Sequence, residues 1–90
     1  MEANKVREAV ATYRRLFSEA GVPKRRCPDD RQPAREEDVL PHCHAMLDAI
    51  DGHLAAGRDG KAFRWLGFVQ GCLWASGRFP ISALKGHNRS

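Results

Sequence analysis

Three segments of this chain repeat apolar residues at intervals of three and four, and a glycine follows each segment. These intervals match one face of an α-helix, which has about 3.6 residues per turn. Gly21, Gly57 and Gly77 favour helix ends, because glycine adopts the left-handed conformation of a C-terminal cap without a steric penalty. Pro80 favours the start of a further short helix. The predicted helices lie at about 3–20, 39–56, 60–76 and 81–86.

No segment of the 90 residues shows the alternating pattern of a strand, so the sequence predicts an all-α protein. We expect a small three-helix bundle with a short fourth C-terminal helix and a long basic loop, residues 21–37, between the first two helices. This loop holds three of the five prolines and no periodic apolar pattern. A chain of this length is expected to form one domain, residues 1–90.

The third predicted helix is apolar around most of its circumference, so we expect it to be buried on most sides. Ala62, Leu66, Val69 and Leu73 form one stripe that we assign to the core, and Gln70 lies at its polar margin. The large or sulfur-containing residues beside the stripe are Phe63, Trp65, Phe68, Cys72 and Trp74.

The same helix carries the candidate protein interface. Trp, Phe and Arg are the residue types that anchor protein interfaces, but a small core also needs large aromatic residues. We assign Trp74 to the core, and for Trp65 both interpretations stay open. Gly67 and Gly71 lie on one face, where they either allow another backbone to approach closely or leave a groove. The candidate interface residues are Lys61, Arg64, Trp65, Gly67, Phe68 and Gly71.

A second candidate surface is basic. The chain has a net charge of +4, and residues 24–35 contribute five basic and two acidic groups. These cations could contact nucleic-acid phosphates without reading bases, although Asp29 and Asp30 partly neutralise the loop. A helix-turn-helix is not expected, because the third helix shows aromatic residues and glycine instead of polar side chains. The candidate nucleic-acid residues are Lys24, Arg25, Arg26, Arg31 and Arg35.

Candidate metal and catalytic residues are few. His42, Cys43 and His44 are adjacent, so on a helix they point about 100° apart and cannot share one ion. The three cysteines are widely spaced and odd in number, which argues against a disulfide framework. His44 and Asp48 could form an acid/base pair or an ordinary surface hydrogen bond. We therefore expect no metal, no cofactor and no enzymatic activity.

Residues 61–88, "KAFRWLGFVQGCLWASGRFPISALKGHN", resemble the C-terminal part of small accessory proteins carried by tailed phages and prophages, whose activity is unknown. The shared pattern is a KA-RWLGF-QG-LW helix, a glycine turn and a short helix ending near HN. The chain departs from it at Pro80, Ser82 and Ala83, where the family has a Thr cap followed by acids, so a role for an acidic group there is in doubt. The matching residues are Lys61, Ala62, Arg64, Trp65, Leu66, Gly67, Phe68, Gln70, Gly71, Leu73, Trp74, Gly77, Ile81, Leu84, His87 and Asn88.

The resemblance covers about a third of the chain and implies a phage-type accessory protein. Together with the candidate interface, it leads us to expect a non-enzymatic protein that binds a host protein, for host takeover or to inhibit a host defence. A second copy of the chain is an alternative partner, and nucleic acid at the basic loop is the second functional alternative. The N-terminus has no apolar signal segment and no stretch is long enough to span a membrane, so we expect the host cytoplasm and no membrane partner.

Overall fold

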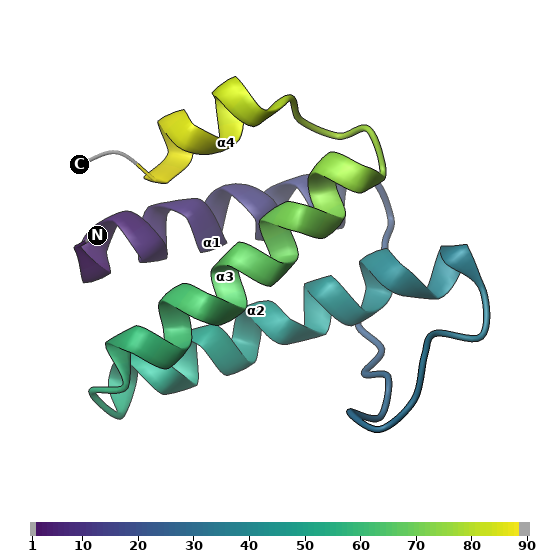
Figure 1. Ribbon diagram of the computed structural model, residues 1–90, viewed down its shortest axis with the longest axis horizontal. Coiled ribbons are helices and arrows are strands. Elements are labelled where there is room, and N and C mark those ends of the chain that lie inside the picture. Colours follow the sequence, from purple (N-terminus) through teal and green to yellow (C-terminus); the bar gives the residue numbers. More distant parts are fainter. Residues whose placement is uncertain (1, 89–90) are drawn as a thin grey trace.

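The computed structural model describes residues 2–88, and all of its regular secondary structure over that range is helical (Figure 1). Its Cα radius of gyration is 12.5 Å, close to the value of about 12 Å expected for a folded chain of this length. The predicted all-α class is confirmed, and the described residues contain no strand. The helices are α1 (Ala3–Glu19), α2 (Val39–Ala55), α3 (Asp59–Ala75) and α4 (Ile81–Asn88).

One segment differs from its predicted state. The predicted loop 21–37 is wrong at its last two residues, because Glu36–Asp38 form a short 3-10 turn, η1, that leads into α2. The backbone N–H of Asp38 donates to the carbonyl of Arg35 at 3.0 Å and closes this turn. Residues 20–35 lack regular helix, and we call them the connecting loop.

All three long helices end in the same way. Gly21, Gly57 and Gly77 have φ angles of 71°, 74° and 77°, a conformation that side chains other than glycine rarely adopt. After Gly77, the N–H of Arg78 donates to the carbonyl of Leu73 at 2.8 Å, and equivalent bonds follow the other two glycines. This is the Schellman arrangement, which satisfies carbonyl groups left open at a helix end.

The core lies between α1, α2 and α3. In Figure 1, α2 and α3 are joined by a tight turn, and α4 lies beside α1 near the N-terminus. Ala62, Leu66, Val69 and Leu73 are all fully buried, so the predicted stripe of the third helix is confirmed. The buried apolar residues facing it from α1 and α2 are Val6, Ala9, Val10, Tyr13, Phe17, Cys43, Met46, Leu47, Ile50 and Leu54.

The opposite side of α3 is not buried, and here two predictions are wrong. Trp74, which we assigned to the core, is 54% exposed, and α3 is not covered on most sides. The physical reason is the position of α4, which packs mainly on α1 and leaves the outer side of α3 uncovered. Leu84 of α4 is buried and Phe79 packs against the core.

A buried polar network fixes α4 to the core. Gln70, which the sequence places at a margin, is only 6% exposed. Its Nε2 donates to the Tyr13 hydroxyl at 3.0 Å and to Asn88 Oδ1 at 2.6 Å, and Asn88 Nδ2 donates back to Gln70 Oε1 at 3.0 Å. The Tyr13 hydroxyl lies 2.7 Å from His87 Nδ1. Burial raises the pKa of Tyr13, so its hydroxyl stays protonated and can donate to His87.

We predict that Gln70→Leu lowers the free energy of unfolding by about 1–3 kcal/mol, because it removes partners from the Tyr13 hydroxyl and from Asn88. Urea unfolding followed by circular dichroism measures the change. The control Gln32→Leu, at an exposed position of the connecting loop, should change stability by no more than about 0.5 kcal/mol. Equal stability of the Gln70 variant and the parent protein would contradict the proposed role of the network.

Candidate functional site

The outer side of α3 carries the largest exposed apolar side chains. Phe68 is 55% exposed and Trp74 is 54% exposed. At about 100° per residue, Gly67 and Gly71 lie between these two rings on the helix surface, together with Arg64. We call these five residues the aromatic face.

The glycines of the aromatic face are open to the surroundings. A Cβ atom placed at Gly67 or Gly71 would meet no other atom within 4 Å. No described element therefore packs against this row of glycines. The sequence allowed the row either to contact another backbone or to stay open, and within the described residues it stays open. The surface between the two exposed rings therefore has room for additional atoms next to the α3 backbone.

Trp65 belongs to a different environment from Phe68. Its side chain is half-buried and packs against the core. The guanidinium carbon of Arg26 and the Lys61 ammonium each lie 5.6 Å from the Trp65 ring centroid, within range of cation–π attraction. His53 contacts the ring edge-on, at a centroid distance of 4.8 Å. Trp65 thus fills part of the core and joins the connecting loop to α3.

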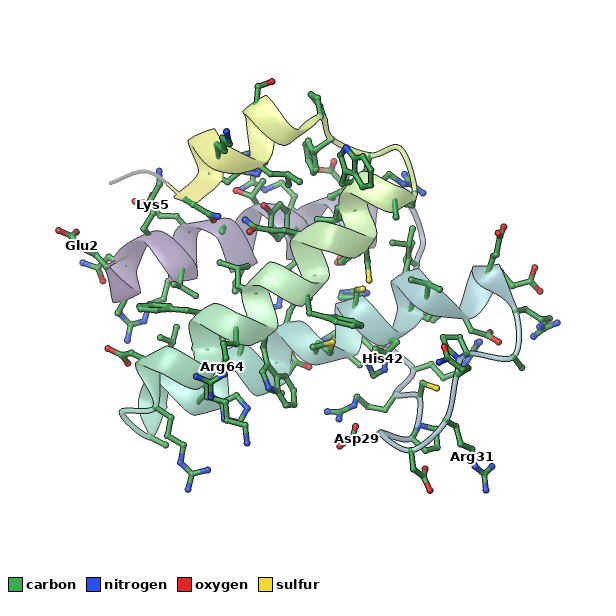
Figure 2. The ribbon with its side chains drawn as sticks, in the orientation of Figure 1. Glu2, Lys5, Asp29, Arg31, His42 and Arg64 are labelled. Atoms are coloured by element: carbon green, nitrogen blue, oxygen red, sulfur yellow. The ribbon has the colours of Figure 1, made fainter. Side chains whose placement is uncertain are left out.

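A cleft of about 410 Å³ lies between the connecting loop, α2 and α3. Figure 2 shows Asp29, Arg31, His42 and Arg64 on the same side of the molecule. The side chains that decide its chemistry are Arg26, Asp29 and Arg31 of the loop, His42 and Met46 of α2, and Arg64, Trp65 and Phe68 of α3. The cleft therefore brings together residues from both candidate surfaces: Arg26 and Arg31 belong to the basic set, and Arg64, Trp65 and Phe68 belong to the interface set.

The loop wall of the cleft is attached to α2 by hydrogen bonds. The N–H of Cys27 donates to His42 Nδ1 at 2.8 Å, which fixes the proton of the neutral imidazole on Nε2. Burial lowers the pKa of His42, and the nearby positive charge of Arg26 adds to that effect, so the ring is neutral at pH 7. The N–H of Arg25 donates to the carbonyl of Pro41 at 3.0 Å.

Most of the predicted nucleic-acid residues contact acidic groups and do not form one patch. The nitrogen–oxygen distances are 2.9 Å for Lys24–Asp48, 3.4 Å for Arg25–Asp38, 3.4 Å for Arg26–Asp29 and 3.0 Å for Arg35–Glu37. Arg31 has no carboxylate within 4.0 Å among residues 2–88. Of the five cations, only Arg26 and Arg31 line the cleft. Of the remaining three, Lys24 pairs with Asp48 of α2, and Arg25 and Arg35 pair with acidic residues of η1.

The sequence left two alternatives for His44 and Asp48, an acid/base pair or a surface hydrogen bond, and the structure forms neither. His44 is buried, and its Nδ1 donates to the carbonyl of Val22 at 2.8 Å, while its Nε2 has no partner. Asp48 instead binds Lys24 and Arg14, and these contacts hold its pKa below the usual range. In the described part of the chain, no group of three or more His, Cys, Asp or Glu could hold a metal ion.

Two cysteines that are far apart in the sequence, Cys43 and Cys72, lie close together in the structure. Cys43 is fully buried on α2, and Cys72 is half-buried on α3. The nearby Cys43 thiol lowers the pKa of Cys72 below the ordinary thiol value, although burial acts in the opposite direction. The same contact, together with burial, raises the pKa of Cys43. Cys72 also lines a second cleft, beside Val22 and Leu40, so its sulfur is the reactive member of the pair.

We found no match for the chain among protein-family models, curated proteins or solved structures. No helix within residues 2–88 has the length and apolar character needed to cross a membrane.

We predict that Cys72 reacts with iodoacetamide at half its maximal rate at a pH below the ordinary thiol pKa of about 8.5, because the Cys43 thiol lowers the pKa of Cys72 and the thiolate forms at a lower pH. Mass spectrometry of the cysteine-containing peptides over a pH series measures this rate, and Cys43 should stay unmodified in the folded protein. Cys43→Ala removes the thiol that lowers the pKa of Cys72 and should move the midpoint upward. A midpoint near the ordinary thiol value of about 8.5 in the parent protein would contradict the thiol contact.

Proposed function

We propose that this chain is a non-enzymatic binding protein that docks a partner protein on the aromatic face of α3. The observation that carries the proposal is the exposure of Phe68 and Trp74, each more than half exposed, beside a glycine row that no described element covers. Large exposed aromatic side chains beside an arginine are typical of the energetic centres of protein interfaces. The row allows a partner backbone to approach α3 closely.

The scaffold in this proposal is a three-helix bundle with a short fourth helix, in which a long basic loop joins the first two helices. Its support is that α2 packs on both α1 and α3, while α4 packs on α1. Because burial is confined to one side of α3, the bundle presents the aromatic face on a rigid helix. A rigid surface loses little conformational freedom on binding.

The partner in this proposal is a host protein, and the role is that of a phage-type accessory protein in host takeover or inhibition of a host defence, within the host cytoplasm. The resemblance of residues 61–88 to small phage and prophage proteins supports this assignment. A catalytic role has less support, because His44 binds a backbone carbonyl and Asp48 is paired with cations.

Nucleic-acid binding by the basic loop is the weaker alternative. Four of its five cations already contact a carboxylate and would have to exchange it for a phosphate: Lys24, Arg25, Arg26 and Arg35. This exchange reduces the electrostatic free energy gained on binding nucleic acid. Exposed ion pairs are weak, so this exchange is feasible, and the test of the proposal includes it as an outcome.

The test compares tagged parent protein with the double variant Phe68→Ser/Trp74→Ser in captures from bacterial lysate. We predict that a host protein retained by the parent is lost with the double variant, with affinity reduced by at least about 30-fold, a typical hot-spot effect of 2 kcal/mol. The fold should survive, because both side chains are exposed. Arg15→Ser, at an exposed position of α1, is the matched control and should keep the partner.

Three outcomes would contradict the proposal. The double variant could capture the same proteins as the parent, or nuclease treatment could abolish every capture, which would favour nucleic acid. Sedimentation could also show that the parent is a dimer and the double variant a monomer, which would identify a second copy as the occupant of the aromatic face.

A further inference from the structure

The cleft beside Phe68 has an apolar floor. Met46 is 6% exposed, Trp65 is half-buried, and Phe68 rises from the floor to the surface. A volume of about 410 Å³ lies within the range of sites that enclose small ligands or a few side chains. An apolar side chain of a partner could therefore be buried on these three residues.

The rim of the cleft is positively charged. Three arginines and one aspartate line it, which leaves two positive charges uncompensated because the His42 ring is neutral at pH 7. Asp29 lies 3.4 Å from Arg26. Among residues 2–88, neither Arg31 nor Arg64 has a carboxylate within 4.0 Å. Arg31 lines the cleft from the loop and Arg64 lines it from α3. Neither guanidinium group donates a hydrogen bond within residues 2–88, so both have donors available for an anion.

The aromatic contacts favour a peptide over a nucleobase. Arg26 and Lys61 already lie over the Trp65 ring, so a base would have to displace a cation in order to stack there. Phe68 is contacted by the His42 ring at a centroid distance of 6.3 Å, nearly perpendicular to it. An aliphatic side chain can pack on Phe68 and Met46 without such a displacement, and carboxylates match the forked geometry of the guanidinium group.

We infer that this cleft binds an acidic segment of the partner protein, in which an apolar side chain rests on Phe68 and Met46 and flanking carboxylates bind Arg31 and Arg64. The inference rests on the proposed function, because Phe68 and Arg64 also belong to the aromatic face. It adds the chemical class of the partner. The hydrogen bond from Cys27 to His42 holds the loop wall in place before binding, which limits the conformational entropy lost on binding.

The experiment uses a short fluorescein-labelled peptide that alternates Glu with Leu and the full-length protein, and fluorescence anisotropy reports binding. We expect micromolar affinity that falls as salt is raised. Arg31→Gln and Arg64→Gln should each weaken binding about tenfold, as expected for the loss of a charge-assisted hydrogen bond. Arg15→Gln is the matched control and should bind as the parent does. Peptides that alternate Glu with Ser, or Lys with Leu, should bind much more weakly.

The inference is overturned if the Glu–Leu peptide does not bind, if Arg31→Gln and Arg64→Gln bind it as well as Arg15→Gln does, or if a single-stranded oligothymidine binds more tightly in competition. The proposed function is tested separately. Loss of a host protein with the Phe68/Trp74 double variant, combined with no binding of the acidic peptide, would leave the docking face in place and reject only the acidic segment.

Discussion

The burial of one stripe of α3 against α1 and α2 is the interaction on which the rest of the structure depends. Ala62, Leu66, Val69 and Leu73 are fully buried there, and large apolar contacts of this kind are the main source of stability in a domain this small. A helix can bury only one side in a contact with two neighbours. The fourth helix packs on α1, so the chain has no further described element to cover the aromatic face. The exposed surface of α3 follows directly from how the core is built.

Much of the fold can be predicted from the sequence because its signals are local. Glycine with a positive φ angle ends each long helix, and the spacing of apolar residues identifies the buried stripe. Trp74 and Gln70 could not be assigned in this way, because both lie near the border of the stripe and the position of α4 decides their environment. Gln70 is buried because Tyr13 and Asn88 satisfy its amide. No local sequence signal indicates this network, because its residues come from three different helices.

In the candidate site, too, the features of single segments could be predicted from the sequence, and the contacts between segments could not. The aromatic and glycine residues of α3 could be identified from the sequence, and so could the charge of the connecting loop. The sequence could not show that the α3 residues and the loop cations line the same cleft. Their proximity depends on the path of the loop, which the hydrogen bond between Cys27 and His42 fixes. The contact of Cys43 with Cys72 depends likewise on how α2 packs on α3. His42 and His44, which the sequence did not assign to any site, bind backbone groups of the loop and hold it on α2.

The most direct test of the central claim, that the fold leaves the glycine row of α3 uncovered, is urea unfolding of Gly71→Ala at low protein concentration. This variant should be more stable than the parent by up to about 1 kcal/mol, because alanine favours the helix and its Cβ meets nothing within 4 Å. Gly77→Ala is the control and should be destabilised, because its φ angle is 77°. A loss of more than about 1 kcal/mol in Gly71→Ala would show that part of the chain packs on the row, and would contradict the account.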